Sequence, residues 1–244
     1  ADLALRELQE FFAHPAKAFL RRRLDVAVPR DVDEPDDAMP LDLDGLQKWG
    51  IGDRMLRRLL DGVAGQVVFD AELRRGELPP GALAEPLIKD VAGKAAALVQ
   101  GTAGLRSLAV RSIDITVDLG NGRRLTGVVP DVRGEQIVRV HYSTLAPKHR
   151  LATWLDLLAL TAASPGTPWS AAAVGWSGGR DRCPKAAMVG PLDQGVRGLL
   201  ADLVDIYDRG MREVVPLPVK AGHAWAEAAS RRRAEDWPAR QAGE

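Results

Sequence analysis

Three carboxylates lie where a divalent metal could bind, on two neighbouring stretches with the character of β-strands. Asp114 and Asp118 fall on the polar face of the first stretch, and Asp131 lies near the end of the second. Carboxylates in such an arrangement can hold Mg²⁺ against a phosphodiester and activate the attacking water. An exposed strand face also carries acids for solubility alone, so both interpretations of Asp114 and Asp118 stay open.

Basic side chains gather at two other places, and both are candidates for contacts with DNA phosphates. Arg123 and Arg124 follow a predicted hairpin turn, and a tip of this kind can reach into a DNA fork. The second run precedes a predicted helix and consists of Lys148, His149 and Arg150. A solvated helix start explains this second run nearly as well as a phosphate contact does.

Four tryptophans are candidates for stacking on nucleic-acid bases: Trp49, Trp154, Trp169 and Trp176. The helical period around Trp154 favours a core position for that residue. Trp169 and Trp176 lie in a region rich in Gly and Pro, where stacking on a base is more open.

Several cofactor-binding motifs are excluded. The segment 177–180 is rich in Gly but lacks the Lys-Ser/Thr pair of a phosphate-binding loop. The single cysteine, Cys183, excludes an intramolecular disulfide, a thiolate zinc site and an iron–sulfur cluster. We therefore predict no cofactor in this chain.

The overall composition is that of a globular protein. The 244 residues contain 33 Lys+Arg and 33 Asp+Glu, so the formal net charge is zero and indiscriminate binding of nucleic acid is disfavoured. No apolar run approaches the roughly 18 residues of a membrane-spanning helix, and the first residues lack the apolar core of a signal peptide. The sequence favours a soluble, cytoplasmic domain with no membrane partner.

Residues 1–100 are predicted to be mainly helical. The spacing of apolar residues predicts a helix before Pro15 and a second one after it, with Phe19 and Leu24 on the buried side. An acidic loop with three prolines follows at 29–40, and a metal site there is disfavoured. Further helices are expected at 41–49, at 53–61 with Asp53 as the cap, and at 83–99.

Residues 101–229 are predicted to form an α/β core, followed by a charged, flexible tail at 230–244. Period-two alternation predicts strands at 113–119 and 124–132, joined by a two-residue turn at Asn121-Gly122. A third strand is expected at 137–142, an amphipathic helix after Pro147, and two short strands at 171–176 and 186–189. A last long helix carries Leu199 and Tyr207.

The order α-β-β-β-α-β resembles the core of the restriction-endonuclease-like PD-(D/E)xK nucleases, so we predict that mixed α/β fold. In the resemblance, Gly127 belongs to the Gly-x-x-Asp box, but Pro130 stands where the metal-binding Asp is expected. Asp131 follows one residue later, and a slip of one residue points a strand side chain to the opposite face. The third strand has Arg139 and His141 in place of the acid and the lysine. The resemblance therefore implies a degenerate nuclease box, with no catalytic residue and no metal.

Nearly the whole chain is similar to the C-terminal domain of RecC, the gamma subunit of the RecBCD helicase–nuclease, exodeoxyribonuclease V. The similarity is carried, in order along the chain, by LQEFFAHPAKAFLRRRL, LDLDGLQKWGIGDRMLRRLLDG, RRLTGVVPDV, LATWLDLLALTAA, PLDQGVRGLLADLVDIYDRGM and PLPVKAGHAWAE. His14-Pro15 occupies the place of the Cys-Pro step of iron–sulfur nucleases in the wider superfamily, which again indicates no cluster.

This resemblance implies a function in DNA repair by recombination without a nuclease centre in the domain itself. It implies the RecB and RecD subunits and forked DNA as partners, and a rigid pin that splits the duplex. We expect the tip at Asn121-Gly122, or else the loop 177–183, to face the DNA. Two alternatives stay open: an active metal-dependent nuclease that uses Asp114, Asp118 or Asp131, and a scaffold that binds only proteins.

Overall fold

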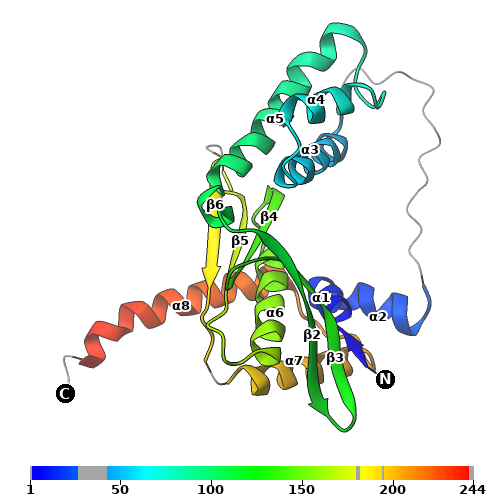
Figure 1. Ribbon diagram of the computed structural model, residues 1–244. Helices are drawn as coiled ribbons and strands as arrows, with labels where there is room; N and C mark the ends of the chain where they lie inside the picture. The colour runs from blue at the N-terminus through cyan, green and yellow to red at the C-terminus, as the bar shows by residue number, and fades with distance from the viewer. Residues whose placement is uncertain (1, 27–42, 180–181, 194, 242–244) are drawn as a thin grey trace.

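Figure 1 shows the computed structural model of the chain, a mixed α/β architecture that describes residues 2–26, 43–179, 182–193 and 195–241, with side chains up to residue 231. The strands are β1 (Leu3–Ala4), β2 (Val110–Gly120), β3 (Arg123–Arg133), β4 (Gln136–Thr144), β5 (Ser170–Trp176) and β6 (Pro184–Val189). The helices are α1 (Leu5–Ala13), α2 (Pro15–Arg23), α3 (Gly45–Leu60), α4 (Gly65–Leu73), α5 (Ala84–Gly101), α6 (Pro147–Ala163), α7 (Val196–Gly210) and α8 (Val219–Gln241). Two short 3-10 turns, η1 (Gly81–Leu83) and η2 (Gly104–Arg106), precede and follow α5.

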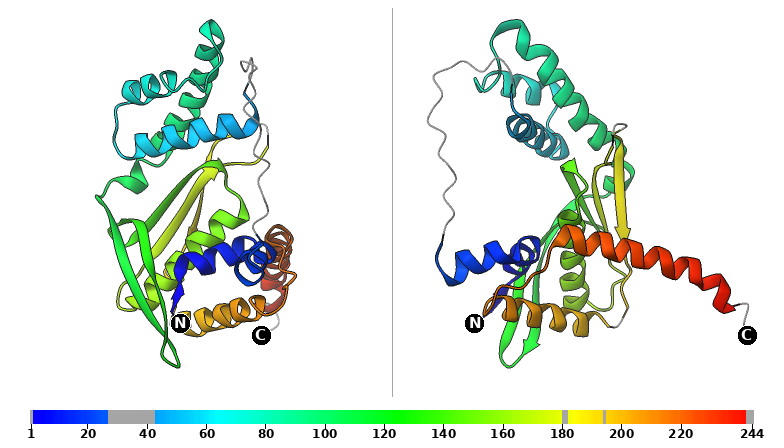
Figure 2. Two further views of the ribbon diagram at one scale, coloured as in Figure 1. Left: turned by 90° about the vertical axis from the view of Figure 1, so that its right-hand side faces the viewer. Right: turned by 180° about the vertical axis from the view of Figure 1, so that it is seen from behind.

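A single mixed sheet organises the molecule. Its strand order is β1-β3-β4-β5-β6, and β2 pairs with β3 outside this path. The pairs β1–β3 and β4–β5 are parallel, whereas β2–β3, β3–β4 and β5–β6 are antiparallel. In Figure 2, α1, α6 and α7 lie together against the sheet, and α3, α4 and α5 form a separate group of helices that meets the sheet elsewhere. No helix in the described part of the chain is long and apolar enough to span a membrane.

Two hydrophobic cores lie on opposite faces of the sheet. The larger core combines α1, α6 and α7 with β2 and β3. The smaller core joins α3, α4 and α5, which we call the helical unit, to β4 and β5. Gly52 of α3 is essential to this second contact, because a Cβ atom there would lie 2.0 Å from the Tyr142 ring. The predicted division of the chain at residues 100 and 229 stays a prediction, but α1 belongs to the core of the sheet.

The β2–β3 hairpin confirms the alternation seen in the sequence. Ile115 and Val117 are buried, and Asp114, Thr116 and Asp118 are exposed. Asn121 and Gly122 have φ angles of 53° and 70°, as a type I′ turn requires. The hairpin tip extends past α7 (Figure 1).

A β-bulge near the end of β3 determines where the Asp131 side chain lies. Arg111 pairs with Val132 and Ile113 pairs with Val129, so Ser112 faces two residues of β3. Asp131 has a φ of 60°, and the extra residue brings its side chain back towards Arg139 of β4. The place of Asp131 relative to the metal position of the nuclease box stays a prediction.

Other expectations fail at the helices. A single helix, α3, replaces the two predicted at 41–49 and 53–61; Asp44, not Asp53, caps it through a reciprocal hydrogen-bond pair with Gln47. Leu24, which was predicted to be buried, is exposed. The buried residues of α2 are Pro15 and Ala18.

The remaining helices differ from the sequence prediction in extent and environment. α6 is not amphipathic, because residues 155–162 are buried on every side by the sheet and by neighbouring helices. α8 follows the predicted last helix and continues through residue 241, so the segment expected as a tail is largely helical; its predicted flexibility stays a prediction. The acidic loop 29–40 lies outside the described residues.

Candidate functional site

Three charged residues and one neutral amide, from four elements, form a compact group on the α6 face of the sheet. We call this group the ion cluster; it consists of Gln9, Asp131, Arg139 and Asp156. Arg139 of β4 donates from Nη1 to Asp131 Oδ2 at 2.8 Å and from Nη2 to Asp156 Oδ2 at 2.6 Å. Asp156 comes from α6, and its other oxygen accepts a hydrogen bond of 2.6 Å from Gln9 Nε2 of α1. The cluster therefore ties β3, β4, α6 and α1 together.

Burial governs the electrostatics of the ion cluster. The side chain of Asp156 is only 3% exposed, and burial raises the pKa of its carboxyl, although Arg139 and Gln9 oppose that shift. The two carboxylates raise the pKa of the Arg139 guanidinium despite its own desolvation. Arg139 is thus a charged guanidinium between two carboxylates.

This arrangement leaves the ion cluster poorly suited to a metal. Both oxygens of Asp156 already accept hydrogen bonds, and the guanidinium lies in the space between Asp131 and Asp156. Within the described ranges, the structure contains no group of three or more His, Cys, Asp or Glu residues that could hold a metal ion. A divalent ion could bridge these carboxylates only after Arg139 moved away.

His141 and His149 form a stacked imidazole pair beside the ion cluster, with ring centroids 4.1 Å apart. Burial lowers the pKa of His141 to about 3, and neighbouring positive charges add to the effect. Burial likewise lowers the pKa of His149 to about 4, and its Nε2 lies 3.0 Å from Ser143 Oγ. Both rings are neutral at physiological pH, so the predicted phosphate contact by His149 has no charge to supply it.

The other two members of the predicted basic run differ in exposure. Lys148 is exposed at the start of α6. Arg150 is turned towards α8, where its Nη1 lies 3.3 Å from His223 Nε2 and 3.8 Å from Glu227 Oε1. Of this run, Lys148 is the residue best placed to meet a phosphate.

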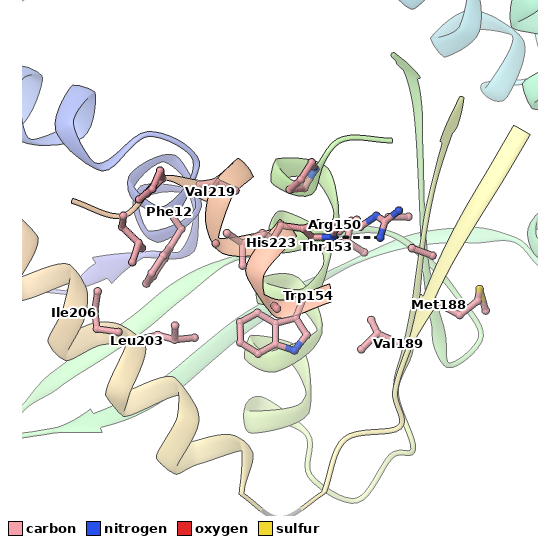
Figure 3. Close-up of a pocket in the computed structure, with 18 residues that line it drawn as sticks. Phe12, Arg150, Thr153, Trp154, Met188, Val189, Leu203, Ile206, Val219 and His223 are labelled. Atoms are coloured by element: carbon pink, nitrogen blue, oxygen red, sulfur yellow. Dashed lines mark hydrogen bonds between the residues drawn. The ribbon is translucent and has the colours of Figure 1, made fainter. Parts of the chain in front are cut away.

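Arg150 also borders an apolar cavity of about 700 Å³ between α6, α7, α8 and β6. Figure 3 shows Trp154, Leu203, Ile206 and Val189 around this space. Trp154 is only partly buried there, on the margin of the larger core. No local sequence pattern indicates the cavity, because it arises where α8 begins to cross α6.

The hairpin arginines are both engaged within the chain. Arg123 Nη1 donates to Asp208 Oδ2 of α7 at 2.6 Å, and Arg124 Nη2 donates to Asp2 Oδ2 at 2.8 Å. These carboxylates raise the pKa of both guanidinium groups. The pairs fix the hairpin near its tip against the body of the domain.

The three predicted metal-binding acids do not come together. Asp114 and Asp118 lie on the exposed face of β2, opposite to the face that Ile115 and Val117 bury. Asp131 contacts Arg139, whose second partner is in α6 on the buried side. The sheet therefore separates the β2 acids from Asp131.

Gly127 and Pro130 of the predicted box have structural explanations. A Cβ atom at Gly127 would lie 2.8 Å from Leu5 Cβ, so the glycine permits the start of α1 to cross β3 closely. Pro130 lies at the bulge that precedes Asp131, where β3 has one more residue than β2.

The open stacking expected for two tryptophans is wrong, since Trp169 and Trp176 are buried, one in each core. Trp49 is exposed on α3. Two hydrogen bonds close the loop 177–183: Ser177 N donates to Cys183 O, and Cys183 N donates to Ser177 Oγ. Residues 180–181 of this loop lie outside the described part.

Sequence reasoning missed Asp156 and Gln9. A usable signal existed for Asp156, because it is a lone carboxylate within the apolar run LDLLALTAA of α6. A carboxylate buried in such a run requires a charged or hydrogen-bonding partner. Gln9 also had a signal, since it lies four residues after Leu5 and three before Phe12, at the spacing of the buried stripe of α1.

Comparison with known proteins places these features in a family. The profile of the family described as RecC C-terminal domain matches residues 1–230. The RecBCD enzyme subunit RecC of Mycolicibacterium smegmatis is 44% identical over 242 residues, which is 99% of this chain and 22% of that protein.

Two further relatives carry the same description. RecC of Mycobacterium tuberculosis strain H37Rv is 42% identical over 228 residues, 93% of this chain and 20% of the relative. RecC of Escherichia coli K12 is 28% identical over 222 residues, 91% of this chain and 19% of the relative. The chain spans about a fifth of the length of the curated relatives it matches. It belongs to the RecC C-terminal domain family.

Proposed function

We propose that this chain is a non-catalytic domain of a RecBCD-type enzyme that guides DNA and contacts the motor subunits RecB and RecD. The order α1-β2-β3-β4-α6-β5 supports a nuclease-like α-β-β-β-α-β core. The relatives are named as subunits of the RecBCD enzyme, which supports these partners and a role in recombinational DNA repair.

The guanidinium of Arg139 is the observation that carries the non-catalytic assignment. A metal-dependent nuclease needs carboxylates free to hold a cation against the scissile phosphate. Here Arg139 supplies a tethered positive charge between Asp131 and Asp156. A tethered guanidinium has no exchangeable water, so it can balance the carboxylates without generating a nucleophile.

The β2–β3 hairpin is the element best suited to divide a duplex. A two-residue turn makes its tip short and stiff, and ion pairs to Asp208 and Asp2 hold it against the body. Splitting a duplex opposes stacking of roughly 1.4 kcal/mol per base step, which a stiff projection can resist. Lys148 adds a solvent-exposed charge at the start of α6.

Cleavage assays test the non-catalytic assignment. We expect the purified chain to leave linear single- and double-stranded DNA intact with either Mg²⁺ or Mn²⁺. Metal-dependent cleavage that is lost in Asp131→Ala and retained in the matched control Asp114→Ala would contradict the proposal. Cleavage lost in Asp114→Ala instead would favour an active site on the exposed face of β2.

Unwinding assays test the DNA-guiding role. Arg123→Gln combined with Arg124→Gln, introduced into the full-length subunit of the assembled enzyme, is expected to slow unwinding without loss of assembly. Each exposed pair contributes about 0–1 kcal/mol, so the fold tolerates the change. Unchanged unwinding would contradict a role for the hairpin, and loss of assembly would favour the protein-binding scaffold.

A further inference from the structure

Three arginines meet where the helical unit joins the sheet, and we call them the arginine cluster. Arg106 ends η2, Arg111 lies near the start of β2, and Arg133 ends β3. Arg133 Nη1 donates to the carbonyl oxygens of Arg106, at 3.2 Å, and of Leu108. Arg111 Nη2 donates to Gly134 O at 3.0 Å, one residue beyond Arg133. These contacts bring the three residues together around the open end of the β2–β3 hairpin.

These arginines have no carboxylate partner within the part of the chain that the structure describes. All of their polar contacts are to backbone carbonyls, to the Thr102 hydroxyl or, for Arg111, to the Trp169 ring at 6.0 Å. Glu135, in the adjacent turn, is exposed and makes no ion pair with them. Ten other described arginines form ion pairs, and others, such as Arg58 and Arg197, do not; the cluster is distinguished by its contacts to backbone carbonyls, which orient the guanidinium groups.

The carbonyl contacts orient the guanidinium groups without neutralising them. Arg106 donates from Nη2 to Val99 O at 2.9 Å and from Nε to Thr102 Oγ1 at 3.0 Å, at the C-terminal end of α5. Burial and the like charge of Arg133 lower the pKa of the Arg106 guanidinium. Like charges held this close raise the energy of the free domain, and an anion would relieve that repulsion.

Several donors of the cluster have no acceptor in the described structure. Arg111 uses only Nη2 and Arg133 only Nη1, so their remaining N–H groups face solvent. Two exposed apolar side chains accompany them, Leu108 at 57% and Val110 at 55% exposure. A surface with fixed guanidinium donors and exposed apolar groups matches a phosphodiester backbone together with its sugars.

We propose that the arginine cluster, formed by Arg106, Arg111 and Arg133, binds the phosphate backbone of a DNA strand in the assembled enzyme. This inference rests on the proposed DNA-guiding function and gives it a second contact site. The site lies at the opposite end of the β2–β3 ribbon from the Asn121-Gly122 tip, because Arg111 and Arg133 flank the open end of the hairpin. A strand deflected at the tip would thus have a second anchor on the same ribbon.

Salt-dependent DNA binding tests the proposal in the full-length subunit assembled with its partners, with a fluorescent forked duplex as the probe. Arg111→Gln with Arg133→Gln is expected to reduce the slope of log affinity against log salt concentration by about 2, from ~0.9 for each lost phosphate contact. Arg209→Gln is the matched control, since Arg209 is exposed on α7 and paired with Glu213. The control is expected to leave the slope unchanged.

Other outcomes overturn the proposal. An unchanged slope with intact assembly excludes the phosphate contact, and weakened assembly with an unchanged slope assigns the cluster to a protein interface. If the double variant does not fold, Arg111→Glu decides alone, because that side chain is exposed and makes a single hydrogen bond. A normal slope here with slowed unwinding in the hairpin variant would refute this inference while leaving the DNA-guiding function intact.

Discussion

The ion cluster and the arginine cluster place guanidinium groups in opposite surroundings near the same end of β3, where Asp131 and Arg133 are two residues apart. Arg139 lies between two carboxylates, one of them buried in α6. Arg111 and Arg133 lie near the surface with backbone carbonyls and no carboxylate. In the first arrangement each charged group has an opposite charge within hydrogen-bonding distance, whereas the guanidinium groups of the second have none among the described residues. Charges that are paired within the domain contribute to folding, whereas charges that lack a partner there are available to another molecule.

The largest effect on stability is expected from a substitution in the ion cluster. Arg139→Ala should lower the free energy of unfolding by about 3–5 kcal/mol, because it leaves the Asp156 carboxylate buried without its cation. Denaturant unfolding followed by circular dichroism measures this change. Arg209→Ala serves as the control and should cost about 1 kcal/mol or less, because its ion pair is exposed.

Removing both charges separates ion pairing from packing. Arg139→Met combined with Asp156→Leu should restore most of the stability lost in Arg139→Ala, since a buried pair can often be replaced by apolar groups of similar volume. If the double variant is as unstable as Arg139→Ala alone, the hydrogen bonds to Gln9 and Asp131 contribute more than charge balance does.

An intermediate effect is expected from acid. The folded pKa values of His141 and His149, about 3 and 4, lie below the ordinary value of 6.5, so the unfolded chain takes up protons first as the pH falls. Stability is therefore complete above pH 6.5 and declines below it. Each histidine removes about 1.4 kcal/mol per pH unit, or about 2 kcal/mol by pH 5. Unfolding curves between pH 7.5 and pH 5 measure the decline.

His141→Leu sharpens this prediction. His141 Nε2 is buried without a hydrogen-bond partner among the described residues, so an apolar side chain costs little there at pH 7.5. The variant should lose about half of the acid sensitivity. Undiminished sensitivity would show that other groups, not the imidazole pair, control the acid response.

The smallest effect is expected at the arginine cluster. Arg111→Gln should change the free energy of unfolding by less than about 0.5 kcal/mol, because the exposed side chain makes one hydrogen bond to Gly134 O. Thermal unfolding of the variant and of the parent protein provides the comparison. A loss above 2 kcal/mol would mean that Arg111 serves mainly the fold, and the contrast with Arg139 would disappear.

The sheet was more predictable than the site. Alternating side chains and the Asn121-Gly122 turn are local signals, so the extents of β2, β3 and β4 followed from them within a few residues. The bulge at Asp131 depends on pairing with a partner strand, which no local pattern records. The extra residue there and the contact of Asp131 with Arg139 therefore had no signal in the sequence.

Long-range burial explains the remaining failures. The spacing around Trp154 and Leu158 indicates an amphipathic helix, but helices on several sides bury α6 almost completely. The Gly-rich sequence after Trp176 predicts an open position for this side chain. In the structure Trp176 packs against the helical unit. The arginine cluster combines residues from three elements, and only the tertiary structure brings them together.

Tyr142 couples the position of α3 to that of β4. Its ring lies against the backbone of Gly52, so α3 cannot slide over the sheet without displacing this strand. The adjacent residue, His141, projects to the other face and stacks on His149 of α6, and Arg139 lies on that face too. A force applied to the helical unit is therefore transmitted through the thickness of one strand to the helix at the centre of the larger core.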